Sequence, residues 1–259
     1  MPGRKHPVYS RGEIDDLANE IEATVLVEKA KEAEFRKATV KDLEEENQLA
    51  QLVFGRAANE MPRKVYLEHN PEGDYHLYDQ GKLVAYVTIF PLKKEAIAAF
   101  MKGEVRGWQL DPDDIEQLVP GKPLEVLLMD MVTTPTVPPQ QRKEYGRLII
   151  VNLLKILQSW GAKGIEITKF HAIAGTANGQ HILESAKFTK EEKRGTGRIA
   201  YELDVDNSDA RWLSGYKQAL EEWKQQQKTS PAEHASNDGS KKQSVSTQNP
   251  AIERYISKH

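Results

Sequence analysis

The stretch from Glu125 to Trp160 constrains the fold most strongly, because it reads as a buried strand, a polar turn and a helix. Apolar residues open it in a nearly unbroken run, as expected for a strand buried on both faces: Val126, Leu127, Leu128, Met129, Met131 and Val132. Thr133-Thr134-Pro135 ends this strand, and Pro138-Pro139 keeps the chain extended. The spacing of apolar residues then predicts an amphipathic helix.

A polar turn, Gln141 to Arg147, stands where this helix begins. The first turn of a helix offers free backbone N–H groups and the positive end of the helix dipole to an anion. Arg142, Lys143 and Arg147 add positive charge there. The stretch therefore predicts a binding site for a phosphate or a pyrophosphate.

The turn resembles the central motif of the GCN5-related N-acetyltransferases, the GNAT superfamily. That motif reads Gln/Arg-x-x-Gly-x-Gly/Ala and cradles the pyrophosphate of acetyl-CoA. Gln141 takes its first position and Gly146 its last, whereas Glu144 stands where the first glycine is expected. A glutamate there would repel the pyrophosphate and fill space that the family leaves empty. The resemblance implies a cofactor site formed by these residues: Gln141, Arg142, Lys143, Glu144, Tyr145, Gly146 and Arg147.

Further matches follow in the order of the family over roughly residues 35–205. The start FRKATVKDL resembles the opening strand and helix, with Arg36, Ala38 and Asp42 in the pattern. The stretch DQGKLVAYV resembles a hairpin of the family, and HILESAKF resembles its closing motif. The resemblance implies an α+β fold with a mixed sheet, the GNAT-like acyl-CoA N-acyltransferase fold, with extra N- and C-terminal helices.

Composition excludes several classes of protein. The chain has 259 residues, a formal charge of -3 and no cysteine, so disulfides, a thiol nucleophile and Cys-ligated zinc are excluded. The near-neutral charge gives no support for a nucleic-acid partner bound through bulk charge. Since no apolar run approaches about 20 residues and the N-terminus has no apolar signal core, we expect no membrane contact and a cytoplasmic protein. We predict no metal site.

Four parts are expected along the chain. Residues 1–34 form an extension with a helix at about 11–33, residues 35–206 the GNAT-like domain, residues 207–228 a C-terminal helix, and residues 229–259 a disordered tail. The two outer helices could pack on their own domain, or could hold a second copy or a protein partner.

Local patterns predict the remaining elements. A helix is expected from Thr39 to about Met61, with a buried stripe that ends in Leu52, Val53 and Phe54. Another is expected near 94–102, and His171–Gln180 is expected as a loop. Between Pro91 and Pro123, four residues could face a cationic amine: Trp108, Asp113, Asp114 and Glu116. The alternative is a solvated helix start, where the dipole favours acidic residues.

The resemblance also implies catalytic roles. Main-chain groups of Met131, Val132 and Thr133 would hold the thioester. Asp130 or Glu125 would serve as base, and the alternative is that either carboxylate has a structural role. Leu183 replaces the tyrosine that commonly serves as general acid. Asn178 lies nearby and is expected to contact the cofactor. His181, also nearby, could transfer the proton instead or be an ordinary surface residue.

Two functions remain open from the sequence. The first is an acetyl-CoA-dependent N-acetyltransferase, with acetyl-CoA as cosubstrate and an amine of unknown identity as acceptor. The alternative is a catalytically degenerate GNAT-fold module that binds or regulates a partner.

Overall fold

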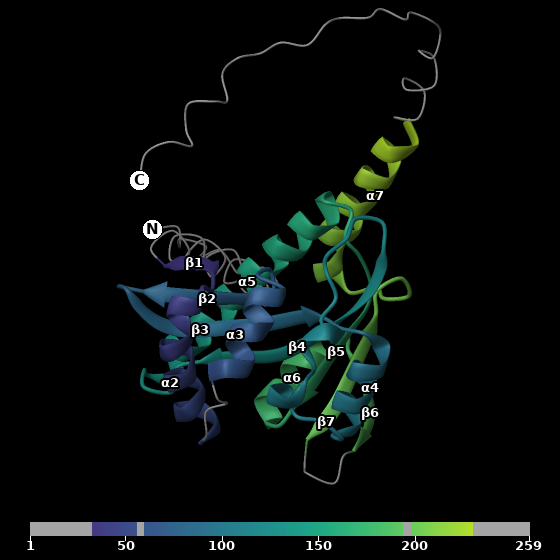
Figure 1. The fold of residues 1–259 in the computed structure, drawn as a ribbon. Coiled ribbons are helices and arrows are strands. Elements are labelled where there is room, and N and C mark those ends of the chain that lie inside the picture. The colour runs from purple at the N-terminus through teal and green to yellow at the C-terminus, as the bar shows by residue number, and fades with distance from the viewer. Residues whose placement is uncertain (1–32, 56–59, 194–197, 230–259) are drawn as a thin grey trace, which may run out of the picture. The chain divides into compact units, whose positions relative to one another are not determined.

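The computed structural model describes residues 33–55, 60–193 and 198–229, and within these ranges seven strands form one sheet (Figure 1). Their order in the sheet is β1-β2-β3-β4-β5-β7-β6. The strands are β1 (Glu34–Lys37), β2 (Asp74–Asp79), β3 (Lys82–Pro91), β4 (Pro123–Thr133), β5 (Glu166–Ala174), β6 (Thr189–Lys193) and β7 (Ile199–Asp204). β4 and β5 pair in parallel and the other described neighbours pair antiparallel, which confirms the predicted mixed sheet.

Helices connect and cover these strands. The α-helices are α2 (Leu43–Phe54), α3 (Glu60–His69), α4 (Lys94–Lys102), α5 (Pro139–Ala162), α6 (Ala177–Ser185) and α7 (Ser214–Thr229). Short 3-10 turns are η1 (Val40–Asp42), η2 (Gly107–Gln109), η3 (Pro112–Asp114) and η4 (Arg211–Leu213). The described residues up to Lys224 form one compact unit, and the site lies within this unit. None of the helices in the described ranges combines the length and apolarity that crossing a bilayer requires. The expected helix at 11–33 and the tail after Thr229 lie outside the described residues.

The alternation along β3 separates the two faces of the sheet. Ala85, Val87 and Ile89 belong to the core that α5 covers, whereas Tyr86 packs with α2 and Phe90 packs with α3 and α4. α6 packs on the same face as α5, through Leu183 against alternate residues of β5 and β7. The site that follows is therefore built from two different layers of helices.

α5 has the amphipathic face that its sequence predicts. Six of its residues are buried in the main core at helical spacing: Tyr145, Leu148, Ile149, Leu153, Leu157 and Trp160. The C-terminal helix packs on this core as well. Tyr216 of α7 accepts a hydrogen bond from the Ile167 N–H at 2.6 Å and donates one to the Ile165 carbonyl at 2.9 Å. The side of α7 that carries Tyr216 therefore packs on its own domain.

The helix expected from Thr39 to Met61 is interrupted. α2 ends at Phe54 because Gly55 adopts the left-handed conformation, with a φ of 71°, and α3 begins only at Glu60. Leu52 and Phe54, expected to be buried, are 60% and 46% exposed. The buried face of α2 instead includes Glu46, a charged residue that the spacing of apolar residues does not predict to be buried.

Two further expectations are corrected. The loop expected at His171–Gln180 is the end of β5 followed by the start of α6. The helix expected after Asp111 is only the short turn η3, in which Asp111 caps the Asp113 N–H at 3.0 Å.

Candidate functional site

β4 and β5 separate partway along their length. Their parallel pairing ends at Leu128 and Ala172. Beyond this pair, β4 continues through Thr133 with β3 as its partner, whereas the end of β5 pairs with β7. A shift in the pairing with β3 coincides with the separation, since Thr88 faces Asp130 and Ile89 faces Leu128. The β4 backbone after Leu128 therefore presents one edge to a gap in the sheet.

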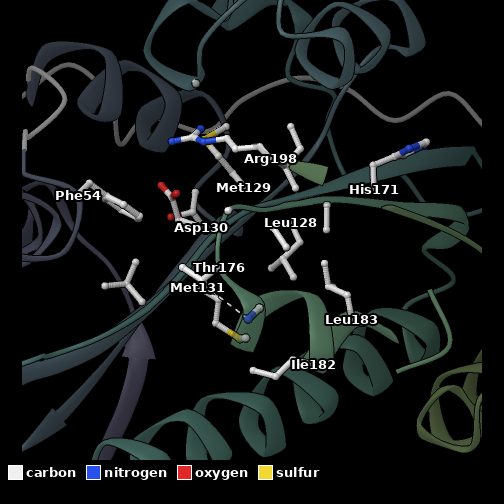
Figure 2. A pocket seen from close by; sticks show the side chains of 18 of the residues that line it. Phe54, Leu128, Met129, Asp130, Met131, His171, Thr176, Ile182, Leu183 and Arg198 are labelled. Carbon is white, nitrogen blue, oxygen red and sulfur yellow. Dashed lines mark hydrogen bonds between the residues drawn. The ribbon is translucent and has the colours of Figure 1, made fainter. Parts of the chain in front are cut away.

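A cleft of about 2340 Å³ opens at this gap and is lined from both faces of the sheet (Figure 2). Figure 2 shows Asp130 and Arg198 on one side of it and Thr176, Ile182 and Leu183 on the other. Sites for drug-sized ligands commonly measure about 300–1,000 Å³. The cleft thus has room for one long ligand and a second, smaller one.

α5 presents a cationic face to the cleft. Arg142, Lys143, Gly146 and Arg147 line it at the spacing of one helical face. The polar turn expected at Gln141–Arg147 is wrong, because α5 already begins at Pro139, a residue suited to the first helical position. The positive side chains reach the predicted site, but they do so from a helix.

The first turn of α5 retains donors for an anion. Pro139 has no N–H, and the Arg142 N–H donates to the Pro138 carbonyl at 3.0 Å. The N–H groups of Gln140 and Gln141 therefore have no partner within the helix. The Arg142 Nε also donates to the Thr133 hydroxyl at 3.1 Å, which ties this end of α5 to the end of β4.

Three of the predicted cofactor residues do not line the cleft. Gln141 donates to the Tyr145 hydroxyl at 2.7 Å, and that hydroxyl donates to Asp79 at 2.5 Å, at the turn between β2 and β3. Burial and the bond to Asp79 raise the pKa of Tyr145 to about 12. Glu144 also lies outside the lining. The structure therefore gives no basis for the repulsion that its carboxylate was expected to cause.

α6 forms the neighbouring wall. Thr176 caps this helix by accepting the Gly179 N–H at 3.1 Å, drawn as a dashed line in Figure 2. Asn178 and His181 line the cleft, as does Leu183, which is 7% exposed. Because leucine has no hydroxyl, the position where the family places its tyrosine offers no proton here.

On the opposite face of the sheet, Glu125 meets His171. The His171 Nε2 lies 2.8 Å from the Glu125 carboxylate, and the Lys94 Nζ lies 3.2 Å from its other oxygen. Burial raises the pKa of Glu125, but the bonds from His171 and Lys94 outweigh it and hold that pKa below its usual value. All three residues line the cleft.

His171 was not among the predicted site residues, because its segment was expected to be a loop. One signal could have found it. Phe170, Ala172 and Ala174 continue the alternation of the preceding strand, and their side chains are buried. Continuing the strand would have brought His171 onto the same face as Glu125.

Asp130 lies on the same face, beyond the separation of the strands. Its carboxylate is 3.4 Å from the Arg63 Nη2, and Arg63 also pairs with the buried Glu46. Figure 2 shows Arg198 beside it. Burial raises the pKa of Asp130, although the charges of Arg63 and Arg198 oppose this.

Buried polar residues of α2, β2 and β3 form a hydrogen-bonded network close to Asp130. The His76 Nε2 lies 3.2 Å from Glu46, and Thr88 donates to Asp74 at 3.3 Å. Burial lowers the pKa of His76 and raises that of Asp74 to about 6. Within the described residues, Glu46, Asp74 and His76 place possible metal-ligand atoms within 4.8 Å of one another. Since Arg63 already pairs with Glu46, we read the group as an ion-pair and hydrogen-bond network.

The segment between β3 and β4 contributes only part of what was expected. Trp108 lines the cleft and is 43% exposed. Asp113, Asp114 and Glu116 do not line it. Asp114 pairs with Lys93 at 3.4 Å and Glu116 with Lys122 at 2.6 Å. These acidic residues therefore do not face a substrate in the cleft. They agree with the alternative interpretation, in which they belong to a solvated turn.

Neither a protein-family model nor a curated protein matches the sequence. The loading GNATL domain of CurA from Lyngbya majuscula is 12% identical, with a TM-score of 0.48 over 68% of this chain and 99% of that chain. The GNAT-like decarboxylase GphF, solved with isobutyryl-CoA, is 11% identical, with a TM-score of 0.46 over 66% and 98%. Naa50 from Arabidopsis thaliana, solved with a CoA-peptide bisubstrate analogue, is 12% identical, with a TM-score of 0.41 over 67% and 99%.

These matches, with identities of 11–12% and TM-scores below 0.5, give no information on the site residues. The order of the elements follows what the resemblance implied: an opening strand and helix, the hairpin β2–β3, the strand β4 followed by the helix α5, and a closing segment that includes α6. The described elements thus have the mixed α/β architecture that the resemblance implied.

Proposed function

We propose that this chain transfers an acetyl group from acetyl-CoA to an amine. The observation that carries the proposal is the exposed edge of β4 after Leu128, which lies in the same cleft as the cationic face of α5. Backbone groups of Met131, Val132 and Thr133 would hold the thioester carbonyl and the pantetheine chain, as fixed dipoles that need no rearrangement during the reaction.

The phosphates of the cosubstrate belong at the start of α5. Arg142, Lys143 and Arg147 supply positive charge to the cleft there, next to the N-terminal end of the helix dipole. Gly146 leaves the surface of α5 flat beside Thr133, since a Cβ at this position would lie 3.9 Å from the Thr133 Cγ2. Asn178, in the first turn of α6, lines the same part of the cleft.

Two groups are suited to accept the proton of the amine. His171, oriented by the carboxylate of Glu125, is the general base that we favour, because the hydrogen-bonded carboxylate fixes the position of the ring. Asp130 is the second candidate on the same face. We assign protonation of the leaving thiolate to His181, the titratable residue of α6 that lines the cleft.

The experiment is release of free CoA thiol from acetyl-CoA in the presence of a panel of amines. The chain has no cysteine, so a thiol reagent reports only the product. Thiol release that requires both the protein and an amine supports the proposal. Binding of acetyl-CoA without turnover of any amine would favour the alternative, a binding or regulatory module, to which the replacement of the tyrosine by Leu183 also points.

A further inference from the structure

We infer that the acceptor is an apolar primary amine without a carboxylate group, with its ammonium held between Asp74 and Asp130. The inference rests on the proposed function, and it names the substrate class of the same cleft. Three features carry it: a row of polar residues across the sheet, the balance of charge around that row, and the wall above it.

The row crosses three neighbouring strands on one face of the sheet. Asp74 of β2 pairs with Thr88 of β3, and Thr88 pairs with Asp130 of β4. All three residues line the cleft. Because neighbouring strands lie about 4.8 Å apart, the two aspartates stand on either side of the small threonine side chain. Along β3, the large rings of Tyr86 and Phe90 border the threonine. The row therefore forms a recess with a carboxylate on each side.

Among the described residues, carboxylates outnumber cations around this recess, since Glu46, Asp74 and Asp130 face two cations, Arg63 and Arg198. Glu46 pairs with Arg63, which leaves the second contact of Arg63, at 3.4 Å, for Asp130. Asp74 is 4% exposed and accepts a hydrogen bond from Thr88. Within the described residues, no cation forms an ion pair with Asp74. A buried carboxylate without a cationic partner is costly, so an ammonium group in the recess would be stabilised there.

Apolar side chains line the cleft above the row. They come from α3, α4, the segment after α4, β3 and β4: Tyr66, Phe90, Ile97, Phe100, Met101, Val105, Trp108 and Met129. The Tyr66 hydroxyl already donates to the Leu110 carbonyl at 2.8 Å. These side chains can therefore bury an aryl or alkyl group of the ligand, but they provide few hydrogen bonds to a polar group.

An amine that carries a carboxylate, such as an amino acid, is the competing class. Lys102 and Arg106 line the same side of the cleft and are the cations that its carboxylate would use. Lys102 is exposed to water, where an ion pair contributes little to affinity. Lys94 is held by Glu125, and Arg198 stands beside Asp130. These placements favour the apolar amine.

The test compares three ligands of one shape: 2-phenylethylamine, the neutral 2-phenylethanol and the zwitterion phenylalanine. Each is titrated calorimetrically into the full chain, once alone and once with CoA at saturation. We expect the amine to bind about tenfold more tightly than either of the others. Equal binding of amine and alcohol, or tightest binding of phenylalanine, in both conditions would overturn the inference.

Substitutions of the two aspartates test where the ammonium group of the ligand binds. Asp130→Asn and Asp74→Asn are each expected to weaken the amine about tenfold and to leave the alcohol unchanged. Asp113→Asn, a matched change outside the cleft, should alter neither. If Asp74→Asn does not fold, the Asp130→Asn result decides, and an unchanged amine affinity in that variant contradicts the inference. A separate titration with CoA alone reports on the proposed function, so the two failures are distinguishable.

Discussion

Glu125 and His171 are 46 residues apart in the sequence, and their side chains meet 2.8 Å apart in the cleft where β4 and β5 separate. One comes from each of the two parallel strands. The pair therefore depends on the register of β4 against β5, in which Glu125 stands opposite Lys169 and Leu127 opposite His171. A carboxylate that orients an imidazole is an arrangement suited to general base catalysis.

Replacing His171 tests this role. We expect His171→Ala to lower kcat for acetyl transfer by about 10²- to 10⁴-fold, since the amine then loses its proton acceptor. The affinity for acetyl-CoA, measured by calorimetry, should not change. His69→Ala is the matched control, because His69 lies outside the cleft. An unchanged kcat for His171→Ala would exclude the imidazole and leave Asp130 as the candidate base.

The packing of α7 on α5 predicts opposite results at two glycines. A Cβ on Gly161 would lie 2.6 Å from the Tyr216 carbonyl oxygen and 3.2 Å from the Leu220 nitrogen. We therefore expect Gly161→Ala to lower the free energy of unfolding by about 1–3 kcal/mol. A Cβ on Gly215 would lie 3.6 Å from the flexible Gln158 side chain, so Gly215→Ala should be neutral or stabilising by up to about 1 kcal/mol. Denaturant titration of both variants measures this, and equal stabilities would contradict the close approach.

Asp74 predicts a dependence of stability on pH. Its pKa is raised from 3.8 to about 6 by burial, so the folded state holds a proton that the unfolded state releases earlier. Its contribution to stability is therefore fully present below pH 3.8 and is lost as the pH rises toward about 6. Asp74→Asn, which cannot ionise, should raise the free energy of unfolding by about 2 kcal/mol at pH 8 and change it little at pH 4. A uniform effect at both pH values would show that Asp74 is ionised without cost.

Lys187 occupies a backbone conformation that favours glycine. Its φ is 68°, in the left-handed region that side chains rarely adopt. Lys187→Gly should raise the free energy of unfolding by about 0.5–1 kcal/mol, because the relief of strain exceeds the added freedom of the unfolded chain. Lys163→Gly, where φ is -90°, is the control and should bring no gain. Thermal unfolding that places Lys187→Gly below the parent protein would contradict this.

Local patterns predicted the elements whose signals are contained in neighbouring residues. The hairpin of β2 and β3 is confirmed, and its turn places Gln80 and Gly81 at φ values of 50° and 75°, as a tight turn requires. The buried face of α5 follows from the spacing of its apolar residues. In both cases the deciding contacts are local or depend only on periodicity.

The features that the sequence could not predict depend on distant partners. Glu46 is buried because Arg63 of another helix neutralises it, and no local pattern indicates that. The family motif placed Gln141–Arg147 in a turn, whereas a proline at the first helical position lets α5 begin earlier. That change moves Glu144 and Tyr145 away from the cleft and keeps Arg142 and Lys143 in it. Matching the sequence to the motif could not distinguish the residues that line the cleft from the neighbouring residues that do not.

Calorimetric titration of the full chain with acetyl-CoA tests the central claim most directly. We predict micromolar binding that weakens at least about tenfold when Arg142 and Lys143 are both replaced by alanine. Lys155→Ala and Glu144→Ala, on the parts of α5 outside the cleft, should leave the affinity unchanged. No binding up to millimolar acetyl-CoA, or an equal loss in the controls, would contradict the assignment of this cleft to a CoA thioester.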